Sequence, residues 1–186
     1  ELGCVIVDAD AIAREIVEPG QPALRELVDA FGPDIVDADG RLLRSRLANR
    51  AFTSKEKTAL LNAITHPRIA ERTAERFAEA GPRDIVVHDM PLLVENDLAA
   101  DCHIVLVVDA PVDVRVKRLV ESRGVDEADA RRRIAAQISD EERLAAADVV
   151  IDNSGTEQAL ITQVDNIWRT RLVPMTGMEG LVEPQP

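Results

Sequence analysis

The sequence predicts an α/β protein with a parallel sheet flanked by helices. Short apolar segments alternate along the chain with segments of helical periodicity, which is the pattern of α/β proteins. Because the apolar segments lack polar alternation, both faces of each strand should be covered, as in parallel sheets. Three of them run into Asp8, Asp89 or Asp109, at the carboxyl edge where such sheets form active sites. The expected strands are the first one, whose apolar part is residues 5–7, and those over residues 85–89, 103–109 and 148–151.

Length and composition narrow the class of protein. The 186 residues suffice for one domain, or for one core with subdomains. The chain has no signal peptide and no apolar run near the ~18 residues of a membrane span, so we expect a cytoplasmic protein without a membrane partner. Cys4 and Cys102 are too few for a disulfide framework or a zinc site. The scarcity of aromatic rings argues against a nucleic-acid partner.

The first strand leads directly into two acids, Asp8 and Asp10. If the strand continues through Asp10, both carboxylates point the same way and can hold Mg²⁺ or act as an acid–base pair. Alternatively, Asp8 is a turn residue and Asp10 is the N-cap of a helix over residues 10–17. The spacing alone leaves both interpretations open.

A long helical region without a strand follows the first strand. Pro19-Gly20 and Gly32-Pro33 separate helices, and His66-Pro67 should interrupt the last of them. His66 is a conceivable base, although a histidine in this position is more often structural. The expected helices are residues 10–17, 22–31, 44–51, 55–64 and 68–80.

The second half of the chain is rich in arginine although the net charge is −12. A helix over 112–123 should end at Gly124, and two arginine-rich helices follow over 126–138 and 139–147. These bases either form a solvated helical hairpin, with pairs such as Glu127–Arg131, or belong to a mobile lid that closes on phosphates. A helix over residues 156–172 follows the last strand, and residues from 174 on have the composition of a tail or linker.

Several motifs occur together in a fixed order. They are Asp8-Ala9-Asp10 with Ala13-Arg14, Glu18-Pro19-Gly20, Leu61-Asn62 with Ile64 and His66-Pro67, Pro91-Leu92-Leu93 with Glu95, Val107-Val108-Asp109, Gln137 with Ser139 and Glu142-Arg143, and Ala147-Asp148 with Ile151-Asp152-Asn153 and Gly155. In this order they resemble the dephospho-CoA kinase family of P-loop kinases, over residues 2–172. The resemblance implies transfer of the ATP γ-phosphate to the ribose 3′-hydroxyl of dephospho-CoA, the last step of CoA biosynthesis, with Mg²⁺ accompanying ATP.

The resemblance also implies roles for individual residues. Asp10 would be the carboxylate near the attacking hydroxyl, and Arg118 would bring positive charge to the transferred phosphoryl group. Dephospho-CoA would be bound by Asp8, Arg14, His66, Leu92, Leu93 and Glu95. ATP would be bound by Arg118, Arg123, Arg143, Asn153 and Gly155. Asp8 would also be a ligand of Mg²⁺.

The implied fold is a P-loop kinase-like parallel sheet with a helical insert and a helical lid. Residues 1–10, 81–111 and 144–173 would form the α/β core, and residues 11–80 the acceptor-side helical subdomain. Residues 112–143 would form the lid, and residues 174–186 a tail or linker. The oligomeric state does not follow from the sequence.

One departure from the family pattern is large. The sequence contains no Gly-x-x-x-x-Gly-Lys-[Ser/Thr] motif, whose backbone N–H groups and lysine bind phosphates. We therefore expect the chain to be an N-terminally truncated member, without the first, central strand and the P-loop, that is inactive as given. Because that strand lies between residues 85–89 and 104–108 in the family, these two strands should be separated by a gap or paired wrongly.

Three other interpretations are compatible with parts of the sequence. A haloacid-dehalogenase-like phosphatase also has two aspartates after its first strand, the first of them a nucleophile. Another nucleotide-type P-loop kinase would share the fold but not the whole motif order. A binding domain without enzymatic activity would account for the missing phosphate loop.

Overall fold

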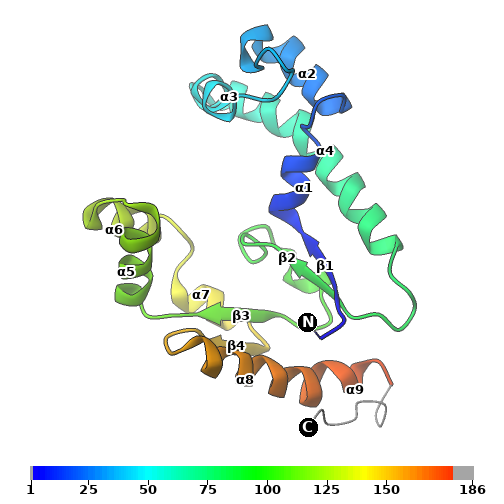
Figure 1. Ribbon diagram of the computed structural model, residues 1–186, viewed down its shortest axis with the longest axis vertical. Coiled ribbons are helices and arrows are strands. Elements are labelled where there is room, and N and C mark those ends of the chain that lie inside the picture. The colour runs from blue at the N-terminus through cyan, green and yellow to red at the C-terminus, as the bar shows by residue number, and fades with distance from the viewer. Residues whose placement is uncertain (1, 178–186) are drawn as a thin grey trace. The chain divides into compact units, whose positions relative to one another are not determined.

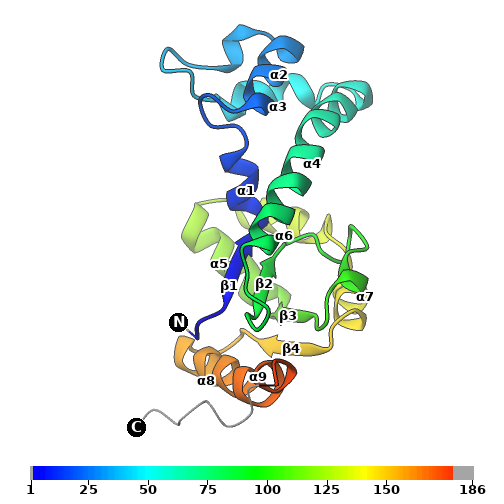
Figure 2. The same ribbon diagram turned by 90° about the vertical axis from the view of Figure 1, so that its right-hand side faces the viewer.

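The computed structural model describes residues 2–177, which divide between Met90 and Pro91 into two compact units (Figures 1 and 2). The first unit contains β1 (Val5–Asp8), α1 (Ala9–Glu15), α2 (Pro22–Phe31), the 3₁₀ turn η1 (Pro33–Ile35), α3 (Arg44–Ala51), α4 (Lys55–Ala78) and β2 (Val86–Asp89). The second contains η2 (Ala99–Asp101), β3 (Leu106–Asp109), α5 (Val112–Arg123), α6 (Glu127–Ala135), α7 (Asp140–Ala145), β4 (Val149–Asp152), α8 (Glu157–Ile167), the π-helical turn η3 (Trp168–Leu172) and α9 (Val173–Met175).

The strands form two parallel pairs, as the alternation of strands and helices predicts. β1 pairs with β2, and Asp8 lies opposite Asp89. β3 pairs with β4, and Asp109 lies opposite Asp152. Within residues 2–177, β2 and β3 share no sheet, so of the two expected outcomes, a gap or wrong pairing, the wrong pairing does not occur among the described residues.

The strands are less covered than the sequence suggests. Val7 and Ile151 are buried, but Ile6 is 67% exposed and Val108 is 56% exposed. In the described chain, one face of β1, β3 and β4 is therefore largely uncovered, and the prediction that both faces are buried is wrong for these strands, whereas residues 86–88 of β2 are half-buried on both faces.

The core of the first unit lies among its helices. Leu27, Ile35 and Ala51 are fully buried and come from α2, η1 and α3. Figure 1 shows α2 and α3 beside one end of α4. The predicted bounds of α2 are confirmed, because Pro22 starts the helix without losing a hydrogen bond and Gly32, with φ of 96°, ends it.

α4 differs from the prediction. It is one helix of 24 residues with Pro67 inside, where the sequence suggests a break. A proline inside a helix removes one backbone hydrogen bond and costs about 3 kcal/mol. Leu61 and Ile64 before the proline and Ile69 after it all pack against the same buried cluster, so side-chain packing holds the two halves of the helix in line.

In the second unit, β3 begins at Leu106 and is shorter than the predicted strand over 103–109. Just before it, the Asp148 carboxylate accepts the Val105 N–H at 2.7 Å. The Val105 carbonyl accepts the backbone N–H groups of Asp148 and Val149, at 3.0 and 3.2 Å, so Val105 is already joined to the start of β4. The predicted bounds of α5 are confirmed, since Gly124 ends that helix in the left-handed conformation.

The last helical region extends further than predicted. α8 gives way to the π-helical turn at Trp168, and α9 continues to Met175, past the point at which the tail is expected. Residues 178–186 of the expected tail lie outside the described residues. Among residues 2–177, no helix is both long and apolar enough to cross a membrane.

Replacing Pro67 by alanine should stabilise the first unit. The new N–H restores the missing backbone hydrogen bond of α4, so we expect a gain in the free energy of unfolding of about 1–3 kcal/mol, reduced by the extra freedom of the unfolded chain. Urea unfolding followed by helical circular dichroism measures the change. Pro22→Ala is the matched control, because Pro22 lies at the start of α2 and costs no hydrogen bond there. A urea midpoint of unfolding that is lower for Pro67→Ala than for the unsubstituted protein contradicts the prediction.

Candidate active site

Asp8 connects β1 to α1. Its Oδ1 accepts the Ala11 N–H at 2.8 Å, so the carboxylate is the N-cap of α1. Its Oδ2 lies 4.0 Å from the Arg14 guanidinium, and both side chains are largely exposed. One oxygen of Asp8 is thus used by the helix, and the other is available to a ligand.

Asp10 lies in the first turn of α1 and not on a strand. The prediction that Asp8 and Asp10 continue one strand and point the same way is therefore wrong, and so is the alternative with Asp10 as N-cap. β1 ends at Asp8 because that residue takes the capping role. Asp10 is exposed and has no hydrogen-bond or ion-pair partner among residues 2–177.

Arg14 follows Asp10 by four residues, so the two side chains lie on the same face of α1. The Arg14 side chain is 60% exposed. One face of α1 therefore presents an unpaired carboxylate in its first turn and a solvent-exposed guanidinium in its last turn. His66 lies in the middle of α4 and is exposed to solvent.

The segment with Leu92, Leu93 and Glu95 forms consecutive turns. The Leu92 carbonyl accepts the backbone N–H of Asn96 at 3.1 Å and its side-chain amide at 2.9 Å. Leu92 is 49% exposed and Glu95 is exposed, whereas Leu93 is half-buried. These residues belong to the second unit, and Asp8, Asp10 and Arg14 belong to the first.

The arginines of the second unit fall into two groups. Arg118 and Arg123 of α5 are exposed, and their guanidinium groups have no partner among the described residues. Arg131 and Arg133 of α6 are instead tied within the helical hairpin. Arg131 pairs with Glu127 at 2.8 Å, and Arg133 pairs with Asp129 at 2.8 Å. These are the pairs expected for a solvated helical hairpin.

Arg143 is held by two carboxylates. It donates to Asp109 at 2.9 Å and to Asp140 at 2.7 Å, and its side chain is only 19% exposed. Burial lowers the pKa of the Arg143 guanidinium, but these two hydrogen bonds outweigh it and raise that pKa. Arg115 also donates to Asp140. Burial raises the pKa of the Asp140 carboxyl, and the hydrogen bonds from both arginines outweigh burial and lower it.

Arg115 and Asp140 carry no sequence pattern that marks them as parts of a site. They are 25 residues apart, and this spacing matches no helical or strand repeat that would bring them together. The sequence does indicate where α7 begins, because Ser139 and Glu142 have the spacing of a capping box; they form one in the structure, and the helix starts at Asp140.

Asn153 and Gly155 follow the end of β4. The Asn153 N–H donates to the Asp109 carbonyl at 2.7 Å, which joins this loop to the end of β3. Gly155 has no positive φ, and a Cβ built on it would meet only the Ala159 Cβ, at 3.8 Å. The local fold therefore does not require glycine at position 155, which leaves close approach of a ligand as a reason for it.

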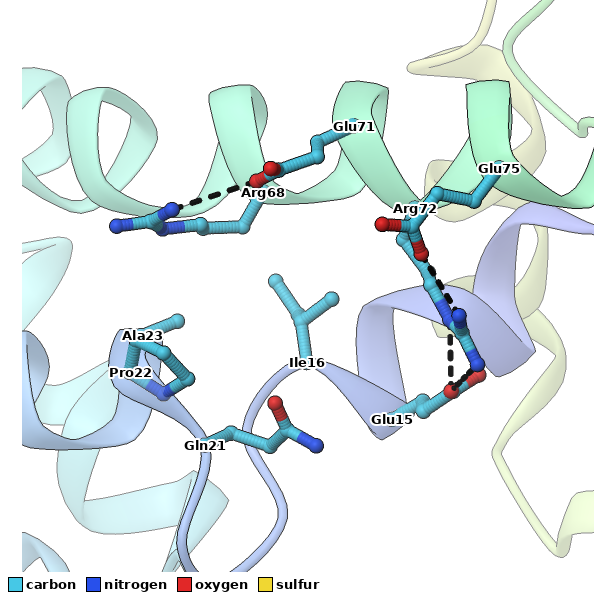
Figure 3. Close-up of a pocket in the computed structure, with 9 residues that line it drawn as sticks. All are labelled: Glu15, Ile16, Gln21, Pro22, Ala23, Arg68, Glu71, Arg72 and Glu75. Carbon is cyan, nitrogen blue, oxygen red and sulfur yellow. Dashed lines mark hydrogen bonds and ion pairs between the residues drawn. The ribbon is translucent and has the colours of Figure 1, made fainter.

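A second feature of the first unit is a pocket beside α4, shown in Figure 3. Arg72 of α4 donates to Glu15 of α1 at 2.8 Å, and Arg76 donates to the same carboxylate at 3.2 Å. These hydrogen bonds hold the pKa of the Glu15 carboxyl below its usual value, and the hydrogen bond from Arg72 has the larger effect. Arg68 reaches Glu26 of α2 at 3.0 Å. Arginines at every fourth position of α4 thus join that helix to α1 and α2.

Within residues 2–177 no cluster of three or more acidic, histidine or cysteine side chains is arranged to hold a metal ion. Mg²⁺ is usually bound by one or two carboxylates together with substrate phosphates. The donor set at the end of β1, with one available oxygen of Asp8, fits that limited role and no more.

Comparison with known proteins gives a consistent picture. Residues 1–159 match the sequence model of a family described as dephospho-CoA kinase. A dephospho-CoA kinase from Corynebacterium efficiens is 59% identical over 167 residues, which are 89% of this chain and 84% of that protein. A crystal structure from Thermus thermophilus matches with a TM-score of 0.73 and 28% identity, covering 89% of this chain and 83% of that one. A dephospho-CoA kinase from Campylobacter jejuni shares the fold, with a TM-score of 0.59, 23% identity, and coverage of 89% and 86% of the two chains.

The contact between Glu15 and the α4 arginines predicts a pH-dependent stability. Because the pKa of Glu15 is lowered by folding, its contribution is complete well above 4.5 and is lost as the pH falls through the lowered value. Glu15→Gln should therefore reduce the free energy of unfolding by about 0.5–1 kcal/mol at pH 7. The difference from the unchanged chain should shrink below pH 4.5.

Urea unfolding at several pH values measures this effect. Glu71→Gln is the control, because Glu71 pairs only with Arg68 of the same helix, at 3.3 Å, and is 61% exposed. A Glu15→Gln effect that stays constant from pH 7 to pH 3 would sink the prediction.

Proposed function

The chain belongs to the dephospho-CoA kinase family, and from that premise we propose a division of roles between its two units. Members of the family are ATP-dependent kinases. The reaction transfers the γ-phosphate of ATP to the ribose 3′-hydroxyl of dephospho-CoA. In our proposal, the first unit supplies the groups that act on the reacting end of the acceptor. The second unit supplies the groups that act on the nucleotide, together with further acceptor contacts at Leu92, Leu93 and Glu95.

The observation that carries the proposal is the unpaired carboxylate of Asp10 beside Arg14 on α1. An exposed, ionised carboxylate in this position can accept a hydrogen bond from the attacking hydroxyl and take its proton as the phosphoryl bond forms. Arg14 supplies a charged donor for the anionic part of the same substrate. His66 and the turn with Leu92, Leu93 and Glu95 complete the proposed acceptor contacts.

The nucleotide groups are proposed from the second unit. Arg118 and Arg123 keep free guanidinium groups, which suits them to neutralise charge on a transferred phosphoryl group. The absence of a side chain at Gly155, beside Asn153, leaves room for a flat ring such as adenine. Arg143 is a weaker candidate, because phosphate would have to displace Asp109 or Asp140 from it.

Mg²⁺ bound with ATP would neutralise phosphate charge, and the available oxygen of Asp8 is the proposed protein ligand. A phosphatase that uses its first aspartate as a nucleophile would need that carboxylate free, whereas Asp8 caps α1. Since Oδ2 of Asp8 remains available, capping alone does not decide between the two, and it is the family match that favours a kinase role for this pair of acids.

Dephospho-CoA should bind to the 186-residue chain without ATP. Arg14→Ala should weaken the binding about tenfold or more, because a charged hydrogen bond to the substrate is lost. Isothermal titration calorimetry measures the dissociation constant. Arg25→Ala, which removes another exposed arginine of the same unit, is the control and should leave the constant unchanged. Equal effects of the two substitutions would refute the assignment of Arg14.

The 186-residue chain should not catalyse the transfer of phosphate from ATP to dephospho-CoA. Its sequence has no Gly-x-x-x-x-Gly-Lys-[Ser/Thr] motif, so these residues do not supply the backbone cradle and lysine that position the β- and γ-phosphates. An assay with ATP, Mg²⁺ and dephospho-CoA should show no CoA above a blank without protein. CoA formation that Asp10→Asn abolishes would overturn the predicted inactivity while supporting the role of Asp10.

A further inference from the structure

We propose that the pocket between α4 and the end of α1 binds the uncharged pantetheine arm of dephospho-CoA. The proposal rests on the function proposed above, because it concerns the same substrate. It assigns a binding site to residues that the sequence motifs do not identify, principally Ile16, Gln21 and Ala23.

The pocket has the size of a small-molecule site. Its volume is about 360 Å³, within the usual range of ligand pockets. Ile16 and Ala23 form its apolar floor, where the buried core of the unit reaches the pocket; they are 7% and 1% exposed, and most of the remaining wall is charged. Figure 3 shows the Ile16 side chain directed toward α4, between Arg68 and Arg72. The full lining is Glu15, Ile16, Gln21, Pro22, Ala23, Arg68, Glu71, Arg72 and Glu75.

The charges in the wall are already paired with one another. Arg72 is bound to Glu15 and Glu75, at 2.8 and 2.7 Å. Arg68 is bound to Glu71 at 3.3 Å and to a glutamate outside the lining at 3.0 Å. A phosphate or an ammonium group would have to compete with these ion pairs for the same charged side chains. The pocket therefore favours a neutral ligand over a charged one.

Gln21 is the exception among the polar groups of the wall. It occupies the N-cap position of α2, but its side chain makes no capping hydrogen bond, and it has no other side-chain partner among residues 2–177. Its amide offers both a donor and an acceptor. The pantetheine arm carries amide groups along an otherwise apolar chain, so it matches an amide placed beside Ile16 and Ala23.

The position of the pocket agrees with a single bound substrate. Asp10 lies in the first turn of α1, and Ile16 is the residue that caps its other end. Six residues of helix separate the two by about 9 Å. Arg14 and Ile16 lie on different faces of α1, because residues two apart on a helix do not face each other. A ligand with its ribose hydroxyl at Asp10 and its diphosphate at Arg14 would therefore reach the pocket with an arm that turns around the end of α1.

The test uses dephospho-CoA, ADP and pantetheine as separate probes of the full 186-residue chain. Methyl NMR spectra should show pantetheine shifting the signals of Ile16 and Ala23 but not that of Ile151 in the second unit. In calorimetry, Gln21→Ala should weaken dephospho-CoA and pantetheine by the same factor, about fivefold for one neutral hydrogen bond. It should leave any binding of ADP, which lacks the arm, unchanged.

Asn49→Ala is the matched control, since Asn49 is an amide of α3 outside the pocket. Helical circular dichroism verifies that Gln21→Ala remains folded. If dephospho-CoA binds with dependence on Arg14 but pantetheine shifts neither methyl and Gln21→Ala has no effect, the pocket assignment is wrong and the proposed function stands. If dephospho-CoA does not bind at all, both are wrong.

Discussion

Parallel pairing in register is the constraint on which the rest of the structure depends. It places an aspartate at the carboxyl end of all four strands of the described chain, with Asp8 opposite Asp89 and Asp109 opposite Asp152. Most of these acids then bind groups of neighbouring segments. Asp8 starts α1, Asp109 holds Arg143, and Asp152 accepts the N–H of Ser154 at 2.8 Å. An aspartate at the end of a strand thus has a structural role here, and only those of its oxygens that form no hydrogen bond within the fold can bind a ligand.

The position of Asp10 illustrates this point. Since Asp8 caps α1, Asp10 falls on the first turn of the helix, where no group of the described chain binds it. The carboxylates and guanidinium groups that form no ion pair are the ones available to bind a ligand. The arginines of α4 form ion pairs that join this helix to α1 and α2. The Arg118 guanidinium has no partner in the described chain and is available to bind a ligand. We therefore look for the functional groups among the charged side chains that have no partner in the fold, such as Asp10 and Arg118.

How much the sequence predicts depends on the range of the interaction that decides each feature. The ends of α2 and α5 follow from Pro22, Gly32 and Gly124, which act locally, and these bounds are correct. The continuity of α4 depends on packing of its two halves against one cluster, which no local pattern around Pro67 reveals. The family motifs indicate which residues belong to the site. They do not reveal that Arg143 is bound by two carboxylates, one of them 34 residues away in the sequence.

The two proposed halves of the acceptor site differ in their electrostatics, and this difference gives a basis for specificity. The exposed face of α1 has an unpaired acid in its first turn and a loosely paired arginine in its last turn, suited to a hydroxyl and a diphosphate. The C-terminal end of the helix, at Ile16, faces a wall whose charges are mutually neutralised. A nucleotide without an arm gains nothing from that second region, and a neutral arm without a nucleotide gains nothing from the first. One short helix can therefore discriminate a substrate that carries both parts from molecules that carry only one.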